Sequence, residues 1–360
     1  MTDRQQQFSG TMDVREAHRF DEAALARYMA VHVEGFVPPL SVAQFRGGQS
    51  NPTYLLTDGS GRRYVLRRKP PGKLLKSAHA VDREYRVISA LGKEGSVPVA
   101  RALALSNDES IIGTAFYIMA HVEGRIFWDA SVPGVTNDER ARIFDAMNET
   151  IAALHGIAPD AVGLSDYGRP GNYFARQIAR WSGQYREDAE AGRFDAMDRL
   201  VDWLPEHIPD GDETAIVHGD FRIDNMIFHP TEPRILAVLD WELSTLGHPL
   251  ADFSYHLMMY RMPPTGFTGL MGADLAALGI PSEAEYIARY CARTGRDGIP
   301  PEDMNFYVAF NMFRLAAILH GILGRVKRGT AASRHAAAQG AMCGPLAELA
   351  WSQVAKGGRA

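Results

Sequence analysis

The chain has 360 residues, which is longer than a single hydrophobic core usually supports, so two domains or lobes are expected. Hydrophobic residues at 46%, charged residues at 22% and a net charge of −5 are typical of a soluble globular protein and exclude a strongly basic nucleic-acid-binding surface. The separated Cys291 and Cys343 argue against a disulfide framework or a cysteine zinc site. With a polar N-terminus that lacks a signal-peptide core, the sequence predicts a cytoplasmic protein that binds neither membrane nor nucleic acid.

Strands and helices alternate in the first third of the sequence. Apolar spacing predicts a helix over residues 21–33, and residues 61–71 read as a strand that Pro70 and Pro71 must end. A second helix is expected to begin after Ser77 as its N-cap and to end before Gly92. Another strand should end near Gly124.

The remainder of the sequence has mainly helical periodicity. Helices are predicted over residues 138–157, 173–191, 193–207 and 306–324. The last is very apolar but is interrupted by Arg314 and His320, so it is predicted to be a buried helix and not a membrane span. The simplest division is an N-terminal tail and helix (1–34), a β-rich lobe (35–122) and a helical lobe (123–360).

The segment AIVHGDFRIDNMIFHPTEPRILAVLDWELS, residues 215–244, alternates between apolar and polar runs. It predicts short strands over residues 215–217, 226–228 and 235–239, the last two forming a hairpin. Because adjacent strands lie about 4.8 Å apart, Asn225 and Asp240 should meet at the open end of that hairpin. Two oxygen ligands at that separation can share one Mg²⁺ ion.

Asp220 precedes Asn225 by five residues and is expected to face a metal-bound phosphate. There it could accept a proton from an attacking hydroxyl. The alternative is a hairpin with acidic, solvated loops. The complete H-x-D-x-x-x-x-N pattern, followed by an aspartate at the end of an apolar strand, favours the chemical interpretation.

The motifs HGDFRIDN and LDWE resemble the catalytic loop and the metal-binding motif of the aminoglycoside phosphotransferases and choline kinases, which are relatives of the protein kinases. GGQSNPTYLL, YVLRRKPPGKLL, AHAVDREYRVI and NMFRLAAILHGI look like the phosphotransferase-like domains associated with acyl-CoA dehydrogenases. The resemblance implies an α+β, two-lobed protein-kinase-like fold, with a small β-rich N-terminal lobe and a larger, mainly helical C-terminal lobe. Nothing in the chain resembles a flavin-binding dehydrogenase fold.

The resemblance also implies roles for the residues of the catalytic loop. Asp220 matches the catalytic base and His218 the histidine that braces the loop. Arg222 lies where many protein kinases carry a lysine near the γ-phosphate, and its guanidinium could offset charge there; the alternative is a surface arginine.

Two cofactors follow from the resemblance, ATP and Mg²⁺. Asn225 and Asp240 match the metal ligands. Glu242 is expected to add either a metal contact or a bracing hydrogen bond.

The β-rich lobe is expected to hold the nucleotide. The turn that contains Gly48, Ser50 and Asn51 can bring backbone N–H groups to phosphates. By resemblance, backbone groups of Ala120 and Val122 should pair with adenine.

A lysine–glutamate pair that is usual in kinases is altered here. Glu84 falls on the inner apolar face of its helix and therefore needs a cationic partner. Arg67 stands where the kinase lysine would be, and Lys69, on the same strand face, is the reserve partner. The inner apolar positions of the helix are Val81, Tyr85 and Ile88. Arginine is usual at this position in the subgroup that the chain resembles.

The sequence says less about the acceptor. Arg314 is expected to form a buried ion pair, or alternatively to contact a ligand, in which case an anionic acceptor such as a hydroxy acid or hydroxyacyl-CoA follows. The subgroup's association with acyl-CoA dehydrogenases points the same way. Asp252 is expected to cap and brace the helix below the site.

Three other functions remain open. A kinase of the aminoglycoside or choline type would have a cationic acceptor. A catalytically silent nucleotide-binding module would explain the arginine at position 67. Transfer to a protein side chain ranks last, because no activation segment is evident after Asp240.

Overall fold

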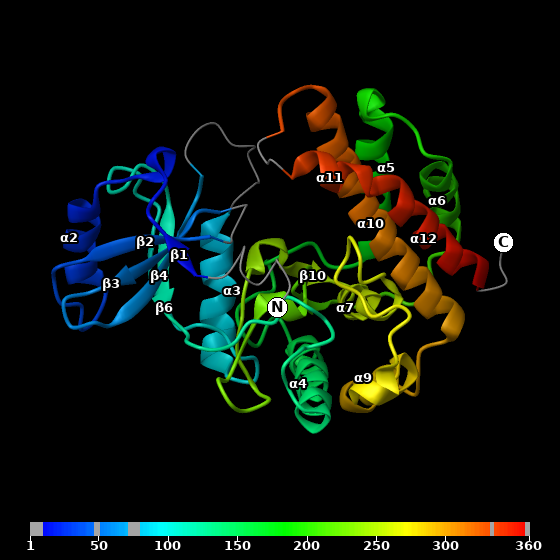
Figure 1. Ribbon diagram of the computed structural model, residues 1–360, viewed down its shortest axis with the longest axis horizontal. Coiled ribbons are helices and arrows are strands. Elements are labelled where there is room, and N and C mark those ends of the chain that lie inside the picture. The colour runs from blue at the N-terminus through cyan, green and yellow to red at the C-terminus, as the bar shows by residue number, and fades with distance from the viewer. Residues whose placement is uncertain (1–9, 47–50, 71–79, 332–334, 357–360) are drawn as a thin grey trace. The chain divides into compact units, whose positions relative to one another are not determined.

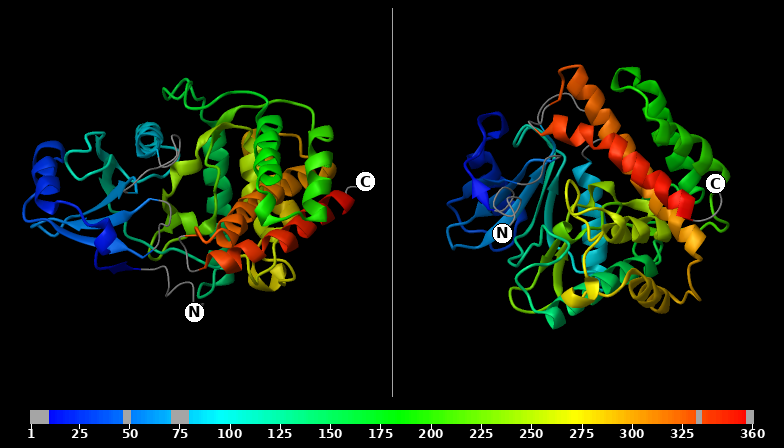
Figure 2. Two further views of the ribbon diagram at one scale, coloured as in Figure 1. Left: turned by 90° about the horizontal axis from the view of Figure 1, so that it is seen from above. Right: turned by 45° about the vertical axis from the view of Figure 1, so that its right-hand side comes forward.

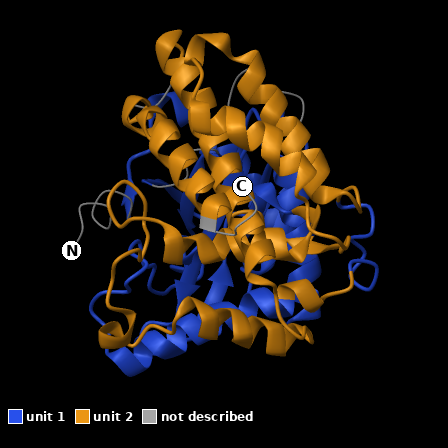
Figure 3. Ribbon diagram, turned by 90° about the vertical axis from the view of Figure 1, so that its right-hand side faces the viewer, with its two compact units in different colours: residues 1–153, 159–167, 222–244 blue, residues 154–158, 168–221, 245–360 orange. Residues whose placement is uncertain are grey.

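The computed structural model describes residues 10–46, 51–70, 80–331 and 335–356. They form two compact units, shown in separate colours in Figure 3. Unit 1 comprises residues 1–153, 159–167 and 222–244, and unit 2 comprises residues 154–158, 168–221 and 245–360. The hairpin segment thus belongs with the N-terminal strands, although the chain on either side of it belongs to unit 2.

The centre of unit 1 is a six-stranded antiparallel sheet in the order β1-β2-β3-β4-β6-β5 (Figure 1). The bounds are β1 Thr11–Met12, β2 Ser41–Phe45, β3 Thr53–Thr57, β4 Arg63–Arg68, β5 Ala102–Ser106 and β6 Phe116–Ala120. Strand β4 ends before Pro70, as predicted, because proline cannot donate to a strand ladder. One face of this sheet buries its apolar side chains against α2 (Glu22–His32), whose first turn is capped by the Asp21 side chain.

Helix α3 (Val81–Glu94) packs on β5, β6 and the short helix η4 (Trp241–Leu243) within unit 1. The predicted N-cap, Ser77, lies outside the described residues. The predicted stop at Gly92 is wrong, because Gly92 lies inside the helix and the chain turns at Gly95, whose φ of 92° suits glycine. Helix α4 (Asn137–Gly156) lies mostly in the same unit, which also contains η1 (Glu16–His18), η3 (Ile223–Asn225), β8 (Met226–Phe228) and β9 (Ile235–Val238).

Unit 2 is mainly helical, and its longest helix, α10 (Pro301–Lys327), packs against α5, α7, α11 and α12; α10 and α12 run side by side in both views of Figure 2. The other elements are α5 Tyr173–Glu187, η2 Ala189–Ala191, α6 Asp195–Glu206, β7 Ala215–Val217, β10 Thr245–Gly247, α7 Pro249–Arg261, α8 Leu275–Leu278, α9 Glu283–Thr294, α11 Ala336–Ala341 and α12 Cys343–Lys356. Strands β7 and β10 form a two-stranded antiparallel sheet.

Helix α10 alone among the described helices is long and apolar enough to cross a membrane by length and composition. Within its most apolar 18-residue window, 72% is buried inside the protein. The prediction of a buried helix over residues 306–324 is confirmed.

Candidate active site

Strands β8 and β9 form the predicted hairpin in unit 1, with Met226 opposite Val238. At its open end the Leu239 N–H donates to the Asn225 carbonyl at 2.8 Å. Asn225 and Asp240, the residue after Leu239, therefore lie close to each other at that end. Asp240 adopts a left-handed backbone conformation with φ 66°. That conformation is unusual for a residue other than glycine and is found preferentially at functional sites.

The predicted pair of Arg67 and Glu84 is present. Arg67 lies opposite Tyr117 in the sheet, and its Nε is 3.0 Å from Oε2 of Glu84, whose side chain is only 1% exposed. Two further groups donate to Glu84, the Tyr117 hydroxyl at 3.1 Å and the Asn51 amide at 3.0 Å. Of the two predicted candidates, Arg67 and Lys69, the partner of Glu84 is therefore Arg67.

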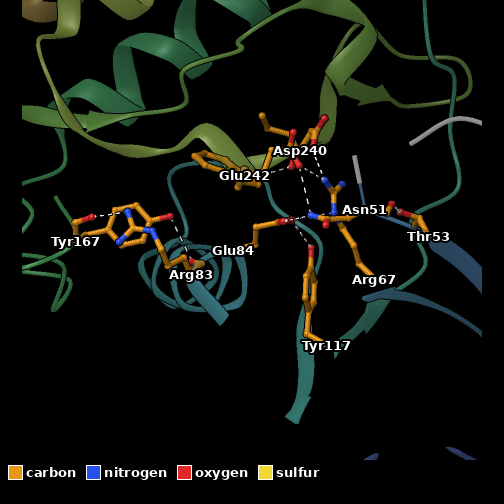
Figure 4. Close-up of polar contacts among 11 residues, drawn as sticks. Asn51, Thr53, Arg67, Arg83, Glu84, Tyr117, Tyr167, Asp240 and Glu242 are labelled. Carbon is orange, nitrogen blue, oxygen red and sulfur yellow. Dashed lines mark hydrogen bonds and ion pairs between the residues drawn. The ribbon is translucent and has the colours of Figure 1, made fainter. Parts of the chain in front are cut away.

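The same guanidinium also reaches the hairpin, as the close-up in Figure 4 shows. Its Nη2 forms ion pairs with Asp240 and, at 3.2 Å, with Glu242. The Asn51 amide donates to Glu242 as well, at 3.4 Å. We call Asn51, Arg67, Glu84, Asp240 and Glu242 the arginine cluster. It joins the sheet, helix α3 and the hairpin in one polar network.

Burial and charge act against each other in the arginine cluster. Burial raises the pKa of Glu84 to about 7, although the neighbouring Arg67 acts in the opposite direction. Burial alone would lower the pKa of Arg67, but the carboxylates of Asp240 and Glu84 raise it, so the guanidinium stays charged. Burial and the charge of Glu84 also raise the pKa of Tyr117 well above its usual value.

Helix α3 is held in place by arginine contacts to backbone carbonyls. Arg83 donates to the Tyr167 carbonyl at 2.6 Å and to the Ser244 carbonyl at 3.4 Å, and its guanidinium lies 4.3 Å from the centre of the Tyr167 ring. One turn on, Arg86 donates to the Gly163 carbonyl at 2.7 Å. These anchors fix the helix that carries Glu84.

A pocket of about 360 Å³ opens beside the arginine cluster, entirely within unit 1. Arg67, Asn225 and Asp240 line it, together with Ala120 and Val122. Most of its remaining wall is apolar and includes Val65, Ile88, Met119, Ile227, Val238 and Trp241. At Gly124 a Cβ atom would come within 2.2 Å of the Phe228 carbonyl oxygen. The segment after β6 therefore needs a glycine at this position to pass so close to the hairpin.

The predicted base lies on a loop of unit 2. Oδ1 of Asp220 accepts a hydrogen bond of 2.5 Å from the Tyr255 hydroxyl, and the Asp220 N–H donates to Nδ1 of His218 at 3.2 Å. His218 thus contacts the backbone of Asp220, within the loop that it is predicted to brace.

Asp252 supports this loop from below. Its two carboxylate oxygens accept the N–H groups of His218 at 2.7 Å and Gly219 at 2.8 Å, and His155 Nε2 lies 3.3 Å from the same carboxylate. Although burial opposes it, these contacts lower the pKa of Asp252. The predicted capping role is wrong, because the N-cap of α7 is His248, which lies outside the helix where its side chain can accept the Leu250 N–H.

Two other arginines differ in their surroundings. Arg314 is buried, but the structure gives it a backbone partner in place of the expected acid: it donates to the Gly219 carbonyl at 2.8 Å and lies over the Tyr255 ring. It therefore also supports the loop of Asp220. Arg222, in unit 1, is half exposed and pairs with Asp224 at 3.2 Å.

The predicted site residues are divided between the two units. Unit 1 holds Asn51, Arg67, Glu84, Ala120, Val122, Arg222, Asn225, Asp240 and Glu242, and unit 2 holds His218 and Asp220. Gly48 and Ser50 lie outside the described residues. The described part of the chain contains no group of three or more His, Cys, Asp and Glu side chains placed to hold a metal ion. Asn225, Asp240 and Glu242 include only two such side chains and one amide.

Sequence reasoning missed Tyr117, which donates to Glu84, and Tyr255, which donates to Asp220. Tyr117 could have been found only from the register that sets it opposite Arg67. Tyr255 lies three residues after Asp252 on α7, and the sequence alone gives no sign that this turn faces the loop.

Comparison with known proteins defines the class. Spectinomycin phosphotransferase APH(9)-Ia, solved with ADP and spectinomycin, matches 93% of this chain and 98% of its own with a TM-score of 0.63 at 14% identity, so the fold is protein-kinase-like. The model of the phosphotransferase enzyme family matches residues 41–304, and the chain belongs to that family.

Closer relatives refine this picture. A crystal structure of a candidate aminoglycoside phosphotransferase from Ralstonia eutropha JMP134 is 54% identical over 94% of this chain and 99% of its own, with a TM-score of 0.86. Acyl-CoA dehydrogenase family member 10 of Mus musculus is 44% identical over 97% of this chain, and member 11 of Homo sapiens is 41% identical over 94%. This chain spans only 32% and 44% of those two relatives. The predicted resemblance is confirmed.

Proposed function

We propose that this protein is an ATP- and Mg²⁺-dependent phosphotransferase that acts on the hydroxyl group of a small molecule. One observation carries the proposal: Asn225 and Asp240 lie close to each other at the open end of the hairpin, beside Arg67, and line a pocket of about 360 Å³. Unit 1 thus contains oxygen groups that would bind Mg²⁺, an arginine that would bind the phosphates and an apolar wall against which adenine would lie. Membership of the phosphotransferase family supports the same conclusion.

The residues at the hairpin fit the cofactors that we propose. Asn225, Asp240 and Glu242 offer oxygen donors, which Mg²⁺ prefers to nitrogen or sulfur. Bound there, Mg²⁺ would offset charge on the β- and γ-phosphates. Ala120 and Val122 line the pocket. The Ala120 N–H already donates to the Arg101 carbonyl at 2.9 Å, so adenine would have to pair with the other backbone groups of these two residues. ADP in the solved spectinomycin phosphotransferase complex agrees with a nucleotide site in this fold.

The chain's own residues would position and activate the acceptor. Asp220 would accept the hydroxyl proton on its carboxylate, while Tyr255 and His218 hold that carboxylate and its backbone in place. Asp220 precedes Asn225 by five residues in the chain. Arg67 would hold the phosphates and Arg222 would add positive charge near the transferred group.

For the acceptor, we propose a hydroxy acid or hydroxyacyl-CoA. The support is the names of the longer relatives, which are acyl-CoA dehydrogenase family members. Arg314 adds no support, because its guanidinium is committed to the loop of Asp220. The name of the 54% identical protein favours a second candidate, a cationic aminoglycoside acceptor.

A thermal-shift experiment tests the nucleotide and metal site. A ligand at about a hundred times its Kd stabilises the native state by about 2.7 kcal/mol, so ATP or GTP with Mg²⁺ should raise the melting temperature. Asp240→Ala should abolish the Mg²⁺-dependent part of the rise. Asp166→Ala is the matched control, since it removes an exposed carboxylate of the same unit. No response to either nucleotide in the natural protein would contradict the proposal.

A transfer assay then separates the acceptors. The protein is incubated with γ-labelled ATP and either a hydroxyacyl-CoA or an aminoglycoside, and labelled product is measured with Asp220→Asn as the control. Transfer to the hydroxyacyl-CoA alone supports our proposal, and transfer to the aminoglycoside alone supports the second candidate. Nucleotide binding without transfer to any alcohol would identify a silent module.

A further inference from the structure

Arg67 forms ion pairs with Asp240 and Glu242, the two carboxylates that are proposed to bind Mg²⁺. A single atom, Nη2, contacts both Asp240 and Glu242, while Nε faces Glu84 (Figure 4). The Arg67 side chain is only 10% exposed, so water screens these contacts weakly. The two carboxylates of the hairpin therefore already have a cation between them.

We propose that Arg67 is an internal counter-ion that makes divalent-cation binding at Asp240 and Glu242 depend on the nucleotide. The inference rests on the proposed function of this site. A divalent ion that arrives alone would have to share its two carboxylates with the guanidinium, and like charges a few ångströms apart repel strongly in a partly buried site. A phosphate chain removes that obstacle, because it is itself a partner for the guanidinium.

The contacts of Arg67 allow such an exchange without loss of its other partner. Glu84 is fixed by Tyr117 and Asn51, so it can keep Nε in place while the Nη groups turn from the hairpin to phosphate oxygens. A guanidinium has donors in a planar fork and can serve both partners at once. Asn51 also donates to Glu242, which keeps that carboxylate beside Asp240 during the exchange. The expected order is nucleotide before, or together with, the metal ion.

The test measures Mn²⁺ binding, as a paramagnetic probe for Mg²⁺, by water-proton relaxation, which rises when the ion joins a slowly tumbling protein. Each protein is titrated with Mn²⁺ alone and with Mn²⁺ plus AMP-PNP. The main variant is Arg67→Met with Glu84→Gln, which removes the guanidinium without leaving a buried carboxylate unpaired. Arg62→Met is the matched control, because it removes an exposed arginine that directly precedes the same strand and does not line the pocket.

We expect the double variant to bind Mn²⁺ alone about tenfold more tightly than the natural protein, a difference of about 1.4 kcal/mol, and Arg62→Met to behave like the natural protein. Arg67→Lys, whose compact ammonium lacks the planar fork with which the guanidinium bridges Glu84 and the other two carboxylates, should shift in the same direction by a smaller factor and is available if the double variant fails to fold.

Three other results would count against the inference. Equal affinity for Mn²⁺ alone in the natural protein and the variants would overturn it, and so would tighter binding in Arg62→Met to the same degree. If either of these two results is obtained while the natural protein does bind Mn²⁺ in the presence of AMP-PNP, the inference is wrong but the proposed function stands. If no protein shows relaxation enhancement even with AMP-PNP, the proposed metal site fails, and the inference fails with it.

Discussion

The arginine cluster of unit 1 and the Asp220 loop of unit 2 are both built around buried charges, but they are held by different kinds of bond. In the cluster, side chains bind side chains: Arg67 contacts Glu84, Asp240 and Glu242. At the loop, charged side chains bind the backbone: Asp252 accepts two N–H groups and Arg314 donates to a carbonyl.

This difference separates a part that can exchange partners from a part that cannot. A phosphate or a metal ion can replace one ion-pair partner of Arg67 by another. No ligand can replace Asp252, because the groups that it satisfies are buried backbone donors. The cluster is suited to respond to a ligand, and the loop is suited to hold Asp220, the proposed base, in one position. The following predictions test that contrast.

Removing the support of the loop should have the largest effect. Asp252→Ala leaves the N–H groups of His218 and Gly219 without their acceptor, and it removes a partner of buried His155. We expect a loss of about 3–5 kcal/mol in the free energy of unfolding, measured by urea denaturation. Asp195→Ala, an exposed aspartate of the same unit, should change it by about 0.5 kcal/mol or less. Equal effects of the two substitutions would refute the structural role of Asp252.

Breaking the cluster should cost somewhat less and be partly reversible by a second substitution. Arg67→Met leaves Glu84 buried beside two other carboxylates, and we expect a loss of about 3 kcal/mol in the free energy of unfolding. Glu84→Gln added to it should recover part of that loss, because the orphaned charge is gone. A double-mutant cycle on urea unfolding measures the coupling, and additive effects of the two changes would contradict the ion pair.

Acid should weaken unit 2 through a buried histidine. Burial lowers the pKa of His256 from 6.5 to about 4, so the folded state binds this proton less readily than the unfolded chain. Its neutral form therefore stabilises the fold fully above pH 6.5, and that contribution is lost as the pH falls toward 4. We expect His256→Gln to flatten the pH dependence of the free energy of unfolding in this range. His32→Gln, at an exposed histidine, should leave the slope unchanged.

The smallest stability change is expected at Tyr255. Tyr255→Phe removes only the hydroxyl that donates to Asp220, so the free energy of unfolding should fall by about 1 kcal/mol. If the base must be held in one orientation, kcat should fall by about tenfold while the Kd for nucleotide stays the same. Loss of nucleotide affinity instead would show that Tyr255 acts elsewhere.

Local pattern was sufficient to predict much of the site. The strands at 215–217 and 226–228 lie where their short apolar runs predicted them, and the hairpin follows from the prolines between β8 and β9. Helical phase placed Glu84 inward, and the cost of burying its charge predicted Arg67 as partner.

What could not be predicted depends on register and on distant packing. The contacts from Asn51 to Glu84 and Glu242 join positions 33 and 191 residues apart, and no local pattern carries that information. The role of Asp252 was misjudged for the same reason: an aspartate in the first turn of a helix suggests a cap, and only the fold shows that the loop of His218 lies against it.

The pairing of β7 with β10 has a consequence for how this protein can be divided. Thr245 lies opposite Val217, so the chain leaves unit 2, supplies residues 222–244 to unit 1 and returns beside its point of departure. No single cut in the chain separates the two units, and a gene fragment that encodes either one would lack a piece of it. Recombination could therefore move this architecture between proteins only as one block. The longer relatives match it in this way, with almost the whole chain aligned to a minority of their length.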